Sequence, residues 1–373
     1  MKKIHVCLVS DQPIPNLTTV LQFRPDTVVL LYTRDKKPQK DRLEKVMKGR
    51  GFEVEGYGIL PYDMANVISV CDSIISNCPG CEVSLNITGG TKIATLGSYQ
   101  VFYSADLPIY YVNTRDHEII QVSPKEKKIP IDVRIPIKEY LAVYGFTIES
   151  VTSNISPIFA RKEATDAMRD LAIKSERSIG ILNGSFPENL EKVTFPVETG
   201  PLDDAILALV PVLQKYGIAN PGENGGLRVA TLEHANYLRG FWFEECVYMA
   251  AKAAGPEEVA LNVIGQWDAT GKKSPRNEFD VMIGKGNRLY FISCKTRNPN
   301  VKVGNEGIGK EFLYELDSLG DQALGLFGKK MLASARPVTD EYVKKRAKVM
   351  GIQILDRNDL ANLKGKIKEW LTA

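Results

Sequence analysis

Two strand-like runs stand close together in the last third of the chain, Asn277-Glu-Phe-Asp-Val-Met-Ile283 and Leu289-Tyr-Phe-Ile-Ser-Cys-Lys-Thr296. The turn-forming residues between them favour a β-hairpin. Side chains alternate between the two faces of a strand. We therefore expect Asp280 on one face of the first strand, with Phe279 and Val281 together on the other.

In the second run, the same alternation places Ser293 and Lys295 on one face. Pairing of the two strands would bring Glu278 and Asp280 beside Lys295. Carboxylates that hold a divalent cation, with a lysine next to them, are what hydrolysis of a phosphodiester requires. An ordinary cross-strand ion pair on a solvated face explains the spacing equally well. Spacing alone leaves both interpretations open.

The composition is that of a soluble globular protein. The chain has 373 residues, enough for two or three domains, with 44% hydrophobic and 25% charged residues. A net charge of +3 does not by itself indicate a nucleic-acid partner. Of the six cysteines, Cys78 and Cys81 form the one close pair, which without a second pair is a poor zinc site. The first apolar run is too short for a signal peptide and no stretch approaches a membrane span, so we expect a cytoplasmic protein without membrane contact.

The first third alternates strands with helices. Residues 4–9 and 27–32 are continuous apolar runs, as in strands that are covered on both faces. Further strands are expected at 52–57, 82–87 and 109–112, with helices between them. This order predicts a doubly wound, Rossmann-like α/β sheet, which binds ligands at the carboxyl ends of its strands.

Two loops follow those strand ends, Ser10-Asp-Gln12 and Thr88-Gly-Gly-Thr-Lys92. Glycines allow close backbone approach, and the free amides at a helix N-terminus attract phosphate. A tight turn with Thr91 as the helix cap is the alternative. We favour an anionic ligand, because two glycines, two threonines and a lysine exceed what a turn requires. The candidate ligand-binding residues are Ser10, Asp11, Gln12, Thr88, Gly89, Gly90, Thr91 and Lys92.

The middle of the chain is rich in proline, and strand alternation weakens from about Pro130. Small helices with a strand pair there suit a winged-helix-like connector, which we interpret as joining domains. The last third begins with a predicted long helix over 232–254. Three strands follow, at 259–267, 278–283 and 289–294, and then a helix over 309–326.

This order, with an acid on the helix, an acid on the second strand and a lysine on the third, resembles the PD-(D/E)XK nuclease fold. The first unit, with Ser10-Asp-Gln12 and Thr88-Gly-Gly-Thr-Lys92, looks like a CARF domain, the sensor of cyclic oligoadenylates in type III CRISPR defence. Together they resemble the CRISPR-associated CARF nucleases. The expected class is thus α/β, with a CARF domain at 1–135, a connector at 136–225 and a PD-(D/E)XK restriction-endonuclease-like domain at 226–373.

The resemblance implies roles for individual residues. Asp280 would bind the catalytic metal, Mg²⁺ or Mn²⁺, and Lys295 would orient the attacking water or stabilise charge on the phosphate. Glu244 would assist as a metal ligand or base, a role that neighbouring Glu245 could equally fill. Two further candidates are Glu278, in support of the metal, and Gln322, on the following helix.

The sequence departs from the family pattern at Ser293, where an acid is expected two residues before the lysine. A hydroxyl is a poor substitute for a carboxylate in holding Mg²⁺ or Mn²⁺. Deliberate replacement of the acid, transfer of its role to Glu278 and loss of catalysis all remain open. On charge alone, we expect this chain to cleave slowly or not at all.

The resemblance also implies partners. A two-fold homodimer would present two glycine loops to one ring of cyclic tetra-adenylate. Backbone amides at 89–92 would take phosphates, and the first loop would take ribose or base edges. The substrate would be DNA, RNA or both, with candidate backbone contacts at Lys272, Lys273, Arg276, Arg297 and Lys302.

The competing functions are a non-catalytic transcriptional regulator that senses the cyclic nucleotide, and a small-molecule enzyme with a nucleotide cofactor.

Overall fold

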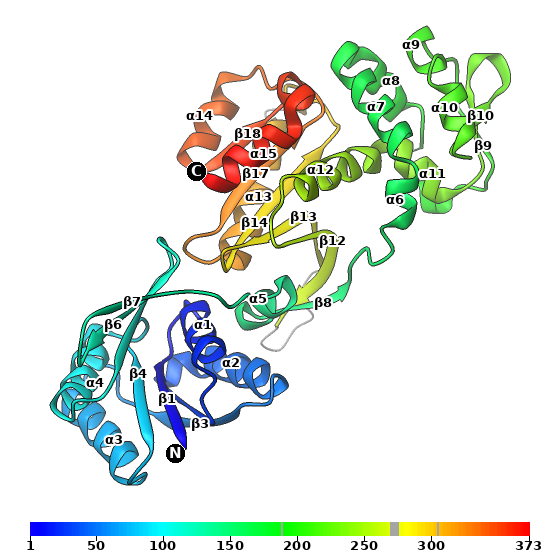
Figure 1. Cartoon of the computed structure of the whole chain (residues 1–373). Coiled ribbons are helices and arrows are strands. Elements are labelled where there is room, and N and C mark those ends of the chain that lie inside the picture. The colour runs from blue at the N-terminus through cyan, green and yellow to red at the C-terminus, as the bar shows by residue number, and fades with distance from the viewer. Residues whose placement is uncertain (188, 269–275, 304–305) are drawn as a thin grey trace.

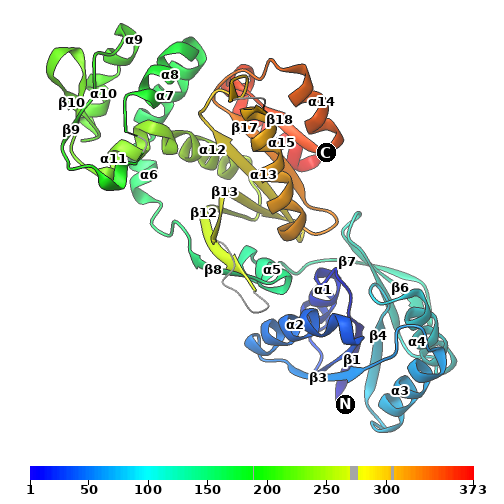
Figure 2. The same cartoon turned by 180° about the vertical axis from the view of Figure 1, so that it is seen from behind.

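The structure is a computed structural model that describes residues 1–187, 189–268, 276–303 and 306–373. It contains two large β-sheets with helices on both faces, and a helical segment beside the second sheet (Figures 1 and 2). Helix α5 (Ile137–Tyr144) lies between the two sheets in both views. None of the helices in the described ranges has the length and apolar content that a membrane span needs.

The N-terminal sheet has the strand order β3-β2-β1-β4-β5-β6-β7. Its first five strands pair in parallel, and β6 and β7 extend the edge in antiparallel fashion. The strands are β1 (Lys3–Leu8), β2 (Thr27–Tyr32), β3 (Glu53–Gly58), β4 (Glu82–Asn86), β5 (Ile109–Asn113), β6 (Glu118–Ser123) and β7 (Lys127–Pro130). The Rossmann-like alternation predicted for this part is confirmed.

Helices cover both faces of this sheet, which explains why β1 and β2 are almost entirely apolar. One face packs against α1 (Ile14–Phe23) and α2 (Lys37–Gly49). The other packs against α3 (Met64–Ser76) and α4 (Lys92–Ser104). A short turn of 3-10 helix, η1 (Arg34–Lys36), precedes α2.

The C-terminal sheet has the order β18-β17-β14-β13-β12-β8. The strands are β8 (Phe146–Ser150), β12 (Glu258–Trp267), β13 (Arg276–Lys285), β14 (Arg288–Lys295), β17 (Lys329–Ser334) and β18 (Ile352–Leu355). The hairpin predicted between β13 and β14 is present, with Val281 opposite Ile292 and Lys285 opposite Arg288. Strand β8, which follows α5 directly, joins the edge of this sheet by pairing with β12.

Helices from different parts of the chain cover the C-terminal sheet. On one face lie α12 (Trp242–Ala253) and α15 (Leu363–Thr372). On the other lie α13 (Ile308–Ala323) and α14 (Glu341–Val349), whose core continues through α5 into the N-terminal domain. The remaining short elements here are β15 (Lys302–Val303), β16 (Glu306–Gly307) and η5 (Arg357–Asn362).

The middle segment is mainly helical. It contains α6 (Ser156–Ala160), α7 (Lys162–Lys174), α8 (Glu176–Gly184), η2 (Leu190–Lys192), α9 (Asp204–Leu207), α10 (Val210–Lys215) and η3 (Glu223–Gly225). Strands β9 (Val197–Glu198), β10 (Asn220–Pro221) and β11 (Leu227–Val229) form a small antiparallel sheet. Its core is continuous with that of α12. The winged-helix interpretation and the domain boundaries stay predictions.

The helix predicted over residues 232–254 is not continuous. It consists of α11 (Leu232–Asn236), the π-helical turn η4 (Tyr237–Phe241) and α12. Gly240, with φ of 179° and ψ of −31°, interrupts the helical backbone. π-Helical turns change the rotation of the helix that follows them, and they are frequent at functional sites.

The simple alternation predicted for β13 is wrong at Asp280. Phe279 packs with Phe146 and Phe291 on the α13 side, whereas Val281 belongs to the core on the α12 side. The ladder between β12 and β13 skips the pair of Asn262 and Asp280, and Asn262 has a left-handed φ of 52°. The strands twist there, so residues on either side of Asp280 face opposite sides of the sheet.

The aromatic cluster around Phe291 should stabilise the C-terminal domain. Phe291 is 2% exposed, and its ring centroid lies 5.0 Å from that of Phe279. We expect Phe291→Ala to lower the free energy of unfolding by about 3–5 kcal/mol, measured by urea denaturation with tryptophan fluorescence. The exposed Leu96 is a control, and Leu96→Ala should change stability by less than about 0.5 kcal/mol. Equal effects of both changes would contradict this packing.

Candidate active site

Asp280 is fixed to the neighbouring strand β14. Its Oδ2 accepts a hydrogen bond of 2.6 Å from the backbone amide of Cys294 and one of 3.3 Å from the Ser293 hydroxyl. Burial raises the pKa of Asp280, and the charge of Lys295 and the two hydrogen bonds oppose that rise. The carboxylate is thus held where β13 and β14 meet, facing the position at which the family pattern has a second acid.

Lys295 lies in the same place. Its Nζ is 3.3 Å from Oε2 of Glu315 on α13, and 5.4 Å from the centroid of the Phe312 ring. Burial alone would lower the pKa of Lys295, but the charges of Asp280 and Glu315 outweigh burial and raise it. The structure therefore brings Asp280, Ser293 and Lys295 together, as the sequence pattern predicts.

Glu244 faces this group from the first turn of α12. Its Oε2 is shielded from solvent and has no hydrogen-bond partner among the residues that the structure describes. Burial raises the pKa of Glu244 well above its usual value, and the charges of Asp280 and Glu278 raise it further. An orphaned carboxylate of this kind is costly unless a cation or a proton compensates it.

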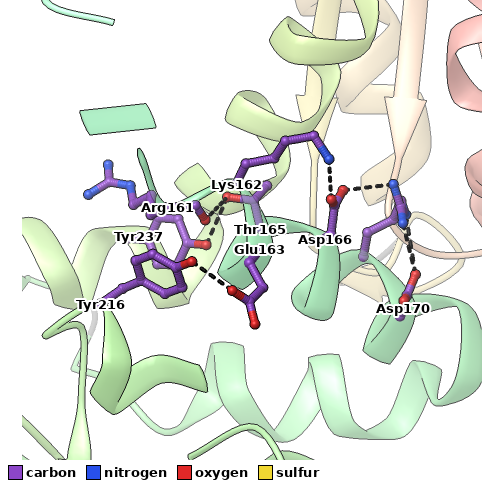
Figure 3. A network of polar contacts seen from close by, with 9 residues as sticks. Arg161, Lys162, Glu163, Thr165, Asp166, Asp170, Tyr216 and Tyr237 are labelled. Carbon is purple, nitrogen blue, oxygen red and sulfur yellow. Dashed lines mark hydrogen bonds and ion pairs between the residues drawn. The ribbon is translucent and has the colours of Figure 1, made fainter. Parts of the chain in front are cut away.

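Glu245, the alternative to Glu244, is already engaged on the other side of α12. Its carboxylate accepts a hydrogen bond of 3.1 Å from Nε of Arg161, a residue of the middle segment. The Arg161 guanidinium also lies over the ring of Tyr237, at 4.8 Å from its centroid, and the hydroxyls of Tyr237 and Thr165 are 3.0 Å apart (Figure 3). The geometry thus directs Glu244, and not Glu245, toward Asp280.

The donor set suits a hard divalent cation. Glu244, Asp280 and the more exposed Glu278 offer carboxylate oxygens, the ligands that Mg²⁺ and Mn²⁺ prefer. Burial and the charge of Asp280 also raise the pKa of Glu278. No three acidic, histidine or cysteine side chains in the described ranges are close enough to enclose a metal ion as they stand. Mg²⁺ is commonly held by one or two carboxylates together with waters and substrate phosphates, so the set fits such an ion.

Glu315 was missed by the sequence reasoning, which named Gln322 on the same helix. Gln322 is exposed, about two helical turns beyond Glu315. The spacing in the sequence could have pointed to Glu315. It follows the buried Phe312 by three residues, which places both side chains on one side of the helix.

A pocket of about 780 Å³ opens beside Glu244. Arg239 and Phe241 of η4 line one side, Arg297 follows β14, and Asn183 of α8 comes from the middle segment. Among the other predicted backbone contacts, Arg276 pairs with Glu149 at 3.0 Å and Lys302 lies on β15. Lys272 and Lys273 lie outside the described residues.

The two predicted ligand loops meet at the carboxyl ends of β1 and β4. A Cβ added to Gly89 would lie 2.3 Å from the Leu8 carbonyl oxygen and 3.0 Å from the Ser10 hydroxyl. Gly90 has a left-handed φ of 86°. The turn itself therefore requires both glycines. Because they have no side chain, the second loop can lie directly against Leu8 and against Ser10 of the first loop.

The threonines of the second loop also have structural partners. Thr91 caps α4 by accepting a hydrogen bond of 3.1 Å from the Ala94 amide, and Thr88 accepts one of 2.8 Å from the Val112 amide. The turn therefore uses the glycines and threonines, which do not by themselves indicate a ligand, and the ligand site stays a prediction. What remains for a ligand is the exposed Lys92 and the first amides of α4.

The first loop contacts the rest of the protein. Oε1 of Gln12 accepts hydrogen bonds of 3.0 Å from the Tyr144 hydroxyl and 3.0 Å from the Leu326 amide. Asp11 pairs with Lys36 at 2.9 Å. Gln12 therefore links the loop both to α5 and to the segment that follows α13.

Comparisons with known proteins agree with this architecture. Residues 4–140 match the Card1 CARF domain family, and residues 232–373 match the Card1-like endonuclease domain family. Can2 from Sulfobacillus thermosulfidooxidans, solved in complex with cyclic tetra-adenylate, is 27% identical over all of both chains, with a TM-score of 0.80. No similar sequence is found among curated proteins.

Two further solved structures share the fold. Protein VC1899 from Vibrio cholerae is 23% identical over 99% of this chain and 98% of its own, with a TM-score of 0.86. A type III CRISPR defence DNA nuclease activated by cyclic oligoadenylate is 15% identical over 90% of this chain and 46% of its own, with a TM-score of 0.57.

The protein is therefore an α/β protein with an N-terminal CARF domain and a C-terminal endonuclease domain, which confirms the predicted class. It belongs to the CRISPR-associated CARF nucleases, with both of its matched domains of the Card1 type.

The contrast between Glu244 and Glu245 can be tested by stability. Folding raises the pKa of the Glu244 carboxyl. Such a group destabilises the folded state once the pH rises above about 4.3, the pKa of a glutamate in the unfolded chain. We expect Glu244→Gln to raise the melting temperature relative to wild type at pH 8, and this gain to vanish as the pH falls toward about 4.3.

Glu245→Gln is the matched control, because it breaks the buried pair with Arg161. It should destabilise the protein by about 3–5 kcal/mol at pH 8. Melting curves of both variants across this pH range provide the measurement. A loss of stability in Glu244→Gln at pH 8 would contradict the orphaned state of its carboxylate.

Proposed function

We propose that the protein is a metal-dependent nuclease of type III CRISPR defence, activated by cyclic tetra-adenylate, with a PD-(D/E)XK-type site that cleaves DNA or RNA. The convergence of Asp280, Glu244 and Lys295 within the endonuclease domain carries this proposal. Carboxylates and an ammonium placed together are suited to binding a scissile phosphate with its counterion.

Asp280 and Glu244 would hold Mg²⁺ or Mn²⁺. Such an ion would polarise the phosphate and activate water for attack. Lys295, whose raised pKa keeps it protonated at neutral pH, would stabilise negative charge on the phosphate. Asp280 is prevented from turning away by the Cys294 amide, so its position is set before substrate binds.

The pocket beside Glu244 offers a route for the nucleic acid. Arg239 and Arg297 would contact its phosphates, and the exposed ring of Phe241 would stack on a base. Trp242 and Trp267 do not offer such a ring, because Trp242 lies in the core and Trp267 packs edge-on against Phe146.

The CARF domain would bind the activator through the N-terminus of α4. Can2, which matches this chain over its whole length, was solved with cyclic tetra-adenylate. Amides at residues 89–92 and the ammonium of Lys92 would take phosphates, and Ser10 would take a ribose or base edge. A two-fold homodimer would supply two such sites for one symmetric ring.

Contacts between the domains provide a physical link for activation. The same loop that carries Ser10 contacts Leu326, just beyond α13, through Gln12. The Tyr140 hydroxyl of α5 donates a hydrogen bond of 2.8 Å to the Leu324 carbonyl at the end of α13. A ligand that changes the conformation of this loop would shift the position of α13. Binding of nucleic acid at the nuclease site would then change the affinity for the cyclic ligand by the same factor.

A non-catalytic sensor that regulates transcription is the second candidate. It is favoured by Ser293, a neutral side chain where an acid is expected, beside Asp280 at 3.3 Å. Cleavage by the unmodified chain would exclude it. Cleavage only after Ser293→Glu would instead identify a site that has lost its catalytic acid.

The proposed activity predicts that cleavage needs both activator and metal. In a panel of single- and double-stranded DNA and RNA, cyclic tetra-adenylate with Mn²⁺ should produce cleavage that EDTA abolishes. Asp280→Asn should reduce the rate by at least about a hundredfold, because the metal loses a charged ligand. A fully active Asp280→Asn protein would refute the assignment of the site.

The activator site predicts a charge effect at Lys92. Lys92→Ala should weaken binding of cyclic tetra-adenylate about tenfold, or roughly 1.4 kcal/mol, measured by calorimetry. Lys125, also exposed but after β6, is the matched control, and Lys125→Ala should leave affinity unchanged. Equal affinities for the two variants would place the ligand elsewhere.

A further inference from the structure

The candidate site lacks an acid at the position of Ser293. This side chain is 4% exposed, and its hydroxyl faces Asp280. Glu278 is the substitute that the sequence suggests, and its side chain is exposed. The structure offers another carboxylate next to Lys295, that of Glu315.

Glu315 reaches the site from α13. Its Oε2 lies 3.3 Å from the Lys295 Nζ, and its negative charge acts on Asp280 as well, since it contributes to the raised pKa of that carboxyl. Phe312, Leu313 and Leu316 are buried against the sheet and fix the rotation of the helix. Glu315 is therefore held beside β14 by its own element.

We propose that Glu315 is a metal-binding carboxylate of this nuclease, which takes the place of the acid missing at position 293. The inference rests on the proposed function, since it assigns a further ligand to the same site. The unpartnered and shielded Oε2 of Glu244 is the independent sign that this cluster is built to receive a cation.

A purely structural ion pair explains the arrangement less well. Half-exposed pairs contribute little to stability, and the Glu315 side chain is 54% exposed. Lys295 already has the charge of Asp280 next to it. The charge of Glu315 adds repulsion with Asp280, a cost that a bound divalent cation removes.

The test uses the full chain and measures metal binding separately from cleavage. Mn²⁺ affinity is measured by calorimetry, without nucleic acid, for wild type and Glu315→Gln. We expect the variant to bind Mn²⁺ about 10–100-fold more weakly. Glu311→Gln, an exposed acid one turn earlier on α13, is the matched control and should bind as wild type does.

A second background separates a metal ligand from a residue that only positions Lys295. In Lys295→Met, a positioning role disappears, so a further Glu315→Gln change should not alter Mn²⁺ affinity. If Glu315 is a ligand, the further change weakens Mn²⁺ binding in this background too. Absence of that loss would overturn the proposal.

Rescue provides the complementary experiment. Glu315→Gln should lose cleavage, and Ser293→Glu in the same chain should restore both cleavage and Mn²⁺ affinity, because the acid returns to the strand. Since Ser293 is buried, Ser293→Asp is made in parallel and the melting temperature of each variant is recorded. If neither Ser293→Glu nor Ser293→Asp folds, the Mn²⁺ affinities of the other variants decide whether Glu315 is a metal ligand.

The outcomes distinguish this inference from the proposed function. A wild-type protein that cleaves, with a Glu315→Gln variant that cleaves and binds Mn²⁺ equally well, overturns the role of Glu315 and leaves the nuclease intact. Mn²⁺ binding that depends on Glu315, without cleavage of any nucleic acid, supports the metal site and refutes the nuclease. Weakened binding together with lost and rescued cleavage supports both.

Discussion

The concentration of negative charge at the meeting point of β13 and β14 is the constraint around which the endonuclease domain is arranged. Glu244, Asp280 and Glu315 come from three different elements and converge on Lys295. Burial, together with the charges of neighbouring carboxylates, raises the pKa values of Glu244 and Asp280 and disfavours the cluster in the absence of a cation. Extensive packing of α12 and α13 on opposite faces of the sheet provides the stability that tolerates this cost.

Helix α13 connects this cluster to the CARF domain. Glu315 lies in the middle of this helix. Just beyond its end, the Leu324 carbonyl accepts a hydrogen bond from Tyr140, and the Leu326 amide donates one to Gln12. One apolar core runs from α1 and α2 through α5 to α13. Because a packed core transmits small displacements instead of absorbing them, a change at the CARF loops has a direct route to Lys295.

Much of this organisation could be predicted from the sequence, because apolar periodicity fixes strands and the spacing of Asp280 and Lys295 follows from one hairpin. What failed depends on backbone conformations that periodicity does not encode, namely the left-handed Asn262 opposite Asp280 and the extended Gly240. The position of Glu315 depends on how α13 rotates when it packs, which is a property of the tertiary fold. The glycine loop lies at the strand end where the sequence predicts it, but the turn itself uses its glycines and threonines, so the ligand site stays a prediction.

The separation of Glu244 from Glu245 shows that the middle segment contacts the helix that carries the candidate site. Neighbouring residues on a helix point about 100° apart, so the rotation of α12 decides which glutamate faces Asp280. That rotation follows η4, which is held in place by Thr165 of α7, hydrogen-bonded to Tyr237, and by the guanidinium of Arg161, the residue just before α7 (Figure 3). Arg161 also neutralises Glu245 and so removes the competing carboxylate. The segment predicted from the sequence to be a connector thus engages Glu245 and leaves Glu244 as the carboxylate that faces Asp280.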